Sequence, residues 1–131
     1  MRLVDTSAWI EKFIGSPLGV RLDREIPQPG ECIVPTLVQL ELAKWLTRER
    51  SEEIADIVIA YTRTCVVVPL DTTLALHAAE ICAVHRLSTA DAIVYAAALA
   101  NSADLVTCDA HFDGLPGVLY FPKRRGPAIK S

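Results

Sequence analysis

The 131-residue sequence contains neither G-x-G-x-x-G nor a Walker pattern, the glycine-rich motifs that bind nucleotide phosphates. Its four cysteines form no C-x-x-C pair and share no metal-ligand spacing with the three histidines. Ser7 lacks the flanking glycines of a hydrolase nucleophile elbow. These absences disfavour glycine-loop nucleotide binding, a zinc site and a serine hydrolase, and leave acidic side chains as the main source of chemistry.

Long apolar runs and excess positive charge are also missing. The longest uncharged apolar run, 92–100, is far shorter than the ~20 residues that span a bilayer. The net charge of −3 disfavours loose binding of nucleic acid by a basic surface, so a polyanionic substrate would need a metal ion or a local arginine cluster. Because no signal peptide is visible, we expect a cytoplasmic protein whose cysteines are reduced core residues, with no membrane association.

Short apolar segments alternate with helical patterns along the chain. We predict strands at 2–4, 32–34, 65–68 and 105–108, a possible fifth strand at 118–121, and helices starting near 8, 36, 52, 72 and 89. The segment 16–19 is either a break or a new helix start. The pattern predicts one α/β domain over 1–122, a three-layer α/β/α sandwich with a short parallel central sheet, followed by a basic tail at 123–131.

Two aspartates directly follow predicted strands. Asp5 follows the first strand, and Asp109 follows the fourth. Because the carboxyl ends of parallel strands lie at one edge of a sheet, we expect the two carboxylates near each other. The alternative is that each merely caps the turn that comes after it.

A glutamate lies on the apolar face of the helix predicted at 36–50. Glu41 has Leu37 and Trp45 one turn away on either side. A carboxylate in such a position is costly unless something compensates its charge. The alternative is an edge position with pairing to Lys44 or Arg48.

A second helical acid, Asp91, is the only charged residue between Arg86 and Asp104. The helix that surrounds it is apolar on every side, which favours a central position. The alternative is a capping box, because Ser88 and Asp91 match the S/T-x-x-D/E pattern.

Taken together, four acids are predicted at strand ends or on buried helix faces. Carboxylates at close range repel one another, so they converge stably only around a cation. A set of oxygen ligands favours a hard ion such as Mg²⁺ or Mn²⁺. Asp113 is a possible additional acid or a turn residue before Gly114.

Four segments carry a family resemblance that covers residues 3–121. The segments V-D-T-S-A (4–8), L-E-L (40–42), L-S-T-A-D-A-I (87–93) and L-V-T-C-D-A-H-F (105–112) resemble the four signatures of PIN-domain ribonucleases. The small single-domain form is similar to the VapC toxins of toxin–antitoxin pairs. Many members carry a glycine four residues after the helix acid, where this chain has Trp45.

The resemblance implies a Mg²⁺- or Mn²⁺-dependent endoribonuclease that releases a 3′-hydroxyl and a 5′-phosphate. It implies a catalytic acidic pocket formed by Asp5, Glu41, Asp91 and Asp109. The metal ion would be held by the three aspartates of this set. It further implies hydroxyls that orient these carboxylates: Thr6, Ser7 and Thr107. Possible phosphate contacts are basic residues near the chain's end and between helices: Arg86, Lys123, Arg124 and Arg125.

The implied partners are an RNA substrate, a cognate antitoxin protein and a second copy of the chain. A homodimer is also suggested by apolar residues at helical spacing: Ile54, Ile57, Val58 and Tyr61. Two alternatives remain open, a non-catalytic protein-binding module on the same fold and a metal-dependent phosphatase. Phosphatases usually carry a second acid two residues after the first, where this chain has Ser7.

Overall fold

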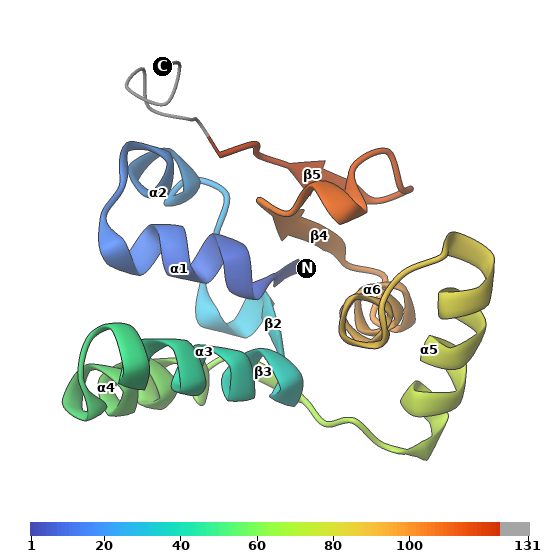
Figure 1. Cartoon of the computed structure of the whole chain (residues 1–131), viewed down its shortest axis with the longest axis horizontal. Helices are drawn as coiled ribbons and strands as arrows, with labels where there is room; N and C mark the ends of the chain where they lie inside the picture. The colour runs from blue at the N-terminus through green and yellow to red at the C-terminus, as the bar shows by residue number, and fades with distance from the viewer. Residues whose placement is uncertain (124–131) are drawn as a thin grey trace.

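Five parallel strands form the centre of the protein, which we describe from a computed structural model over residues 1–123 (Figure 1). The sheet order is β3-β2-β1-β4-β5. Its strands are β1 (Arg2–Val4), β2 (Cys32–Pro35), β3 (Val66–Val68), β4 (Asp104–Thr107) and β5 (Val118–Tyr120). The helices are α1 (Thr6–Ile14), α2 (Pro17–Leu22), α3 (Thr36–Glu49), α4 (Glu52–Thr62), α5 (Thr72–His85) and α6 (Thr89–Ala100), with 3-10 turns η1 (Pro29–Glu31) and η2 (Ala110–Phe112).

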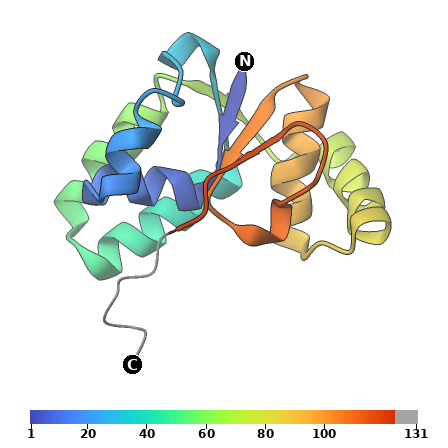
Figure 2. The ribbon, with the colours of Figure 1, turned by 90° about the horizontal axis from the view of Figure 1, so that it is seen from above.

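Helices cover both faces of the sheet. Figure 2 shows α1 to α4 on one side of the strands and α5 and α6 on the other. This arrangement follows from parallel pairing, because each strand must return over one face through a helical crossover. The predicted three-layer α/β/α fold with a parallel sheet is therefore confirmed.

The three central strands are apolar in their buried parts because helices cover both faces of the sheet. Leu3, Ile33 and Leu105, one from each central strand, are fully buried. Helix α6 is buried from residue 92 to residue 98. Cys32 and Cys108 are buried and the other two cysteines half-buried, and all four are free thiols.

Side-chain caps fix the helix starts, which is why the sequence located most of them. Ser51, Asp71 and Ser88 each accept a hydrogen bond from the backbone N–H three residues later. The ambiguous segment near 16 is a helix start, since α2 is capped by Ser16. Gly19 lets α2 pack on α1, because a Cβ there would lie 2.0 Å from the Glu11 carbonyl oxygen.

The strand order reverses direction between β1 and β4. These strands pair with Val4 beside Val106, and β4 extends only one residue further, so both end at nearly the same level of the sheet. Such a switch point opens a crevice at the carboxyl ends of the strands, where α/β proteins bind ligands. Asp5 and Asp109 follow β1 and β4 at this edge.

No helix within residues 1–123 is both long and apolar enough to cross a membrane. Two of the predicted phosphate contacts, Arg124 and Arg125, lie outside the described residues.

Candidate active site

Asp5 is a buried carboxylate held by three donors. It is 6% exposed and accepts hydrogen bonds from the Thr6 backbone N–H (2.7 Å) and from the hydroxyls of Ser7 and Thr107 (2.8 Å each). Burial raises the pKa of Asp5 to about 6, although the three hydrogen bonds act in the opposite direction, and the charge of Glu41 adds to the rise. Asp5 is thus both the N-cap of α1 and a member of an acidic cluster.

Glu41, on α3, lies in the same acidic cluster as Asp5. The hydroxyl of Thr6 donates to Glu41 Oε1 at 2.6 Å, across the contact between α1 and α3. Arg48, one of its suggested ion-pair partners, contacts Glu49 instead. Glu41 is therefore held beside Asp5 by the Thr6 hydroxyl group of α1.

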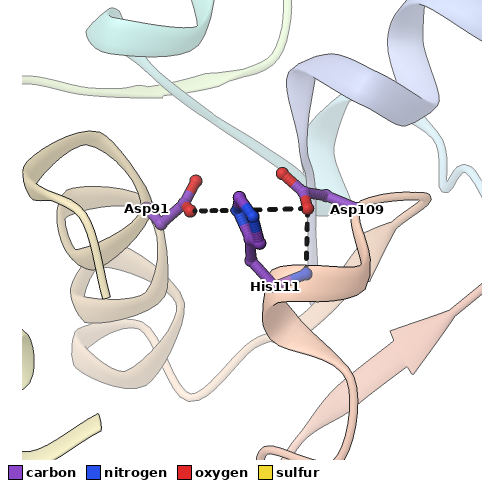
Figure 3. Close-up of side chains that lie close together, drawn as sticks. All are labelled: Asp91, Asp109 and His111. Atoms are coloured by element: carbon purple, nitrogen blue, oxygen red, sulfur yellow. Dashed lines mark hydrogen bonds and ion pairs between the residues drawn. The ribbon is translucent and has the colours of Figure 1, made fainter. Parts of the chain in front are cut away.

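The carboxylates of Asp91 and Asp109 both lie next to the imidazole of His111 (Figure 3). His111 Nδ1 lies 3.0 Å from Asp91 Oδ2 and 3.4 Å from Asp109 Oδ1. The hydrogen bond with Asp91, helped by the negative charges of Asp109 and Asp91, raises the pKa of this exposed histidine. The hydroxyl of Ser88 accepts from the Asp91 backbone N–H, so the helix cap and the carboxylate contact use different atoms of Asp91.

Two hydroxyls link the ends of β1 and β4. Thr107 donates to Asp5 and accepts from the Asp109 backbone N–H at 3.0 Å. Ser7 accepts from the Cys108 backbone N–H at 3.0 Å while it donates to Asp5. These bonds fix the position of Asp5 relative to Asp109.

One pocket unites these side chains. It lies at the carboxyl end of the sheet and is lined by Asp5, Thr6, Ser7, Ile10, Glu41, Ala90, Asp91, Val94, Asp109 and Lys123. All four acids singled out in the sequence are present, together with one predicted phosphate contact, Lys123. The pocket combines carboxylates from four separate segments of the chain with the ammonium group of Lys123.

Two further residues that the sequence analysis singled out, Arg86 and Asp113, lie outside this pocket. Arg86 occupies the left-handed position that ends α5, with φ of 55°, and is not among the described residues that line the pocket. Asp113 is exposed at the end of η2 and likewise does not line it.

His111 was not selected as a site residue from the sequence. The sequence feature that could have pointed to His111 is its position two residues after Asp109, an aspartate at the end of a strand. The Asp109 carboxylate accepts a hydrogen bond from the His111 backbone N–H, and the imidazole lies beside the two carboxylates.

The donor set fits a divalent cation. One ligand atom each from Asp91, Asp109 and His111 lie within 4.8 Å of one another. Two carboxylates and one imidazole suit Mn²⁺ and similar ions, and the carboxylates alone suit Mg²⁺. Both oxygens of Asp5 already accept hydrogen bonds, so this carboxylate is the most firmly oriented of the set.

Comparison with known proteins identifies the family. The PIN domain family model matches residues 2–118. This chain belongs to the PIN domain family. A search of curated proteins finds no match.

Solved structures share the fold. A chain of a toxin–antitoxin complex from Klebsiella pneumoniae matches with a TM-score of 0.81 and 19% identity, covering 94% of this chain and 100% of that one. The sarcin–ricin loop cleaving toxin VapC20 of Mycobacterium tuberculosis matches with a TM-score of 0.74 and 22% identity, covering 93% and 100%. A chain of the DNA-bound VapBC complex of Salmonella typhimurium matches with a TM-score of 0.68 and 16% identity, covering 93% and 98%.

Proposed function

We propose that this PIN-domain protein is a metal-dependent endoribonuclease that hydrolyses RNA phosphodiester bonds with Mg²⁺ or Mn²⁺. The observation that carries the proposal is the convergence of four carboxylates in one pocket. Helix capping explains why single acids stand at strand ends, but it does not require Glu41 and Asp91 to face them. A pocket that collects this much negative charge is costly for the fold unless it binds a cation.

The three aspartates, with His111, are the residues that would hold the ion. When bound, a divalent ion supplies charge neutralisation for the phosphodiester and lowers the pKa of an attacking water. The same charge makes an acidic pocket attractive to an anionic substrate, in a chain whose net charge is −3.

The remaining residues of the pocket orient the carboxylates, accept a proton or bind the phosphate. Ser7 and Thr107 hold the Asp5 carboxylate, and Thr6 holds Oε1 of Glu41. Within residues 1–123, Oε2 of Glu41 accepts no hydrogen bond, and we assign to it the proton of the attacking water. Lys123 lines the pocket and offers an ammonium group to the phosphate.

We further propose that the protein is the toxin of a toxin–antitoxin pair that acts in the cytoplasm. The support is the likeness in fold and length to VapC20 and to chains of toxin–antitoxin complexes. The corresponding partner of this chain is a small cognate antitoxin protein.

A homodimer is also part of the proposal, and α4 provides the candidate face. Val58 is buried in the chain's own core, so one residue of the predicted stripe is already covered. Ile57, Ile54 and Tyr61 stay exposed at 69%, 42% and 38%. A second copy packed about a two-fold axis would cover these three side chains.

The decisive experiment is incubation of the purified protein with structured RNAs in Mg²⁺, Mn²⁺ or EDTA. We expect cleavage only with a metal, and products with 3′-hydroxyl and 5′-phosphate ends. Asp91→Asn serves as the inactive control. Hydrolysis of a small phosphate monoester with intact RNA would favour the phosphatase, and absence of any hydrolysis would favour the non-catalytic module.

A further inference from the structure

A second groove continues from the acidic pocket along α3. It is lined by Thr6, Ile10, Glu41, Lys44, Trp45 and Arg48. Three of these residues, Thr6, Ile10 and Glu41, also line the acidic pocket. A ligand that fills one depression can therefore extend into the other without leaving the surface.

The charge of the side chains changes along the face of α3 that lines both the pocket and the groove. Glu41, Lys44, Trp45 and Arg48 stand at i, i+3, i+4 and i+7, so their side chains form one row. Trp45 is half-buried, packing on the core while it lines the groove. Beyond Glu41 the row thus offers a flat aromatic ring flanked by two exposed cations.

Both cations are available to a ligand. Lys44 is exposed. Arg48 contacts Glu49, but the two side chains are 60% and 47% exposed, and such a surface pair contributes little free energy. Binding of a phosphate to the guanidinium would therefore replace a weak contact with a charge-assisted bidentate one.

An aromatic ring between cations is the arrangement that binds single-stranded nucleic acid. Bases stack on the ring while the cations follow the backbone phosphates. An acidic peptide would use the two cations but would gain no comparable stacking on the indole. Continuity with the pocket proposed to hold the scissile phosphate also favours RNA, because a strand cut there must leave the pocket along an open path.

We propose that this groove is a nucleotide subsite, in which Trp45 stacks a base next to the scissile phosphate and Lys44 and Arg48 bind the adjoining backbone. The subsite deepens the proposed ribonuclease function and rests on it. Because the position four residues after Glu41 carries the large ring of Trp45, the groove restricts the substrate to a strand whose base is free to stack.

Oligonucleotide binding to the Asp91→Asn chain tests the stacking contact. The probe is hexauridylate or hexaadenylate with a 5′ fluorescent label, and its fluorescence anisotropy gives the affinity of every variant without depending on Trp45. In the starting chain, quenching of tryptophan fluorescence by the unlabelled probe additionally reports on Trp45, because Trp9 is fully buried. Trp45→Leu and Trp45→Phe form a matched pair, because both keep an apolar side chain against the core and only Phe keeps a ring.

We expect Trp45→Leu to weaken binding by about 5- to 150-fold, which corresponds to the ~1–3 kcal/mol of one stacked base. Trp45→Phe should retain most of the affinity. Equal affinities for the starting chain and the Leu variant, both folded by circular dichroism, would overturn the proposal.

Salt dependence tests the two cations. The double variant Lys44→Gln/Arg48→Gln should lower the slope of log affinity against log salt by ~0.7 for each phosphate that is no longer neutralised. Arg63→Gln is the control, since Arg63 is an exposed cation at the end of α4, just before the amino end of β3. Identical slopes for the double variant and this control would overturn the backbone contacts.

Cleavage by the chain with Asp91 intact separates the two proposals. Cleavage with unchanged KM in Trp45→Leu would overturn the subsite while the ribonuclease stands. Absence of cleavage by the unaltered chain would overturn the ribonuclease, and the oligonucleotide titration would still decide the subsite. Loss of antitoxin binding in Trp45→Leu with unchanged oligonucleotide affinity would assign the groove to a protein and overturn the proposal.

Discussion

Nδ1 of His111 in η2 lies 3.0 Å from Oδ2 of Asp91 on α6, although the two residues are twenty positions apart in the chain. The contact brings an imidazole next to two carboxylates, since Asp109 lies 3.4 Å from the same nitrogen. When it is protonated, His111 supplies positive charge where a divalent ion would bind.

This contact predicts the titration of His111. Its pKa is raised chiefly by the hydrogen bond to Asp91, so Asp91→Asn should lower it toward the ordinary value near 6.5. Proton NMR of the imidazole in EDTA measures the change. Asp113→Asn is the control, because it removes an exposed acid of the same turn. An unchanged titration in Asp91→Asn would show that the contact is absent in solution.

A second prediction separates catalysis from helix capping. Asp91→Asn should abolish cleavage and leave the free energy of unfolding within about 1 kcal/mol, because Ser88 still caps α6. Ser88→Ala should do the opposite, with a loss of ~1 kcal/mol in stability and normal activity per folded molecule. Urea unfolding and cleavage assays on the same preparations provide the comparison. Unfolding of Asp91→Asn with normal activity of the folded fraction would favour the capping role.

The buried Asp5 predicts how stability depends on pH. Its pKa is about 6 in the folded protein and ordinarily 3.8, so the folded state holds the proton more tightly. The free energy of unfolding should therefore fall as pH rises from about 4 to about 6 and stay lower above that range, by roughly 3 kcal/mol from this group.

Comparison with Asp5→Asn isolates this contribution. In EDTA, the variant should gain stability relative to the unaltered chain at pH 7.5 but not at pH 4.5. Denaturant titrations at the two pH values measure the difference. A constant difference between the two proteins would mean that Asp5 is ionised in both states at both pH values.

Part of this site was predictable from the sequence for a simple reason. Asp5 and Asp109 directly follow apolar strands, and parallel topology alone brings such positions to one edge. Asp91 was found because no other charge occurs in its stretch of helix. These are local features that a linear pattern records.

The other parts depend on contacts between distant segments. The partner of Glu41 is Thr6, thirty-five positions away, whereas the sequence offered Lys44 and Arg48 on the same helix. His111 could not be joined to Asp91 without the path of the chain after β4. The groove beside Trp45 is likewise created by packing of α1 against α3, which no spacing within α3 reveals.

Ile57 provides the test of the proposed homodimer. Ile57→Glu places a charge in the centre of the exposed apolar face of α4, so it should give a monomer where the unaltered chain is a dimer. Light scattering over a dilution series around tens of micromolar measures the mass. Val20→Glu is the control, since Val20 is exposed to a similar degree, 64%, on α2. A monomeric unaltered chain would remove the dimer from the proposal.

The last prediction concerns the proposed toxin role. Expression of the chain alone in a bacterial host should arrest growth, because cleavage of cellular RNA would proceed without an antitoxin. Asp5→Ala should relieve the arrest, and Asp5→Asn should do so with less disturbance, since the amide oxygen can still accept from the Thr6 backbone N–H while the hydroxyls of Ser7 and Thr107 can accept from the amide NH2. Asp104→Asn should remain toxic, because Asp104 is an exposed acid at the amino end of β4, opposite the pocket. Immunoblots confirm equal amounts of each protein. Normal growth with an enzyme that cleaves RNA in the tube would reject the toxin and leave the nuclease, whereas arrest by both Asp5 variants would place the toxicity outside the acidic pocket.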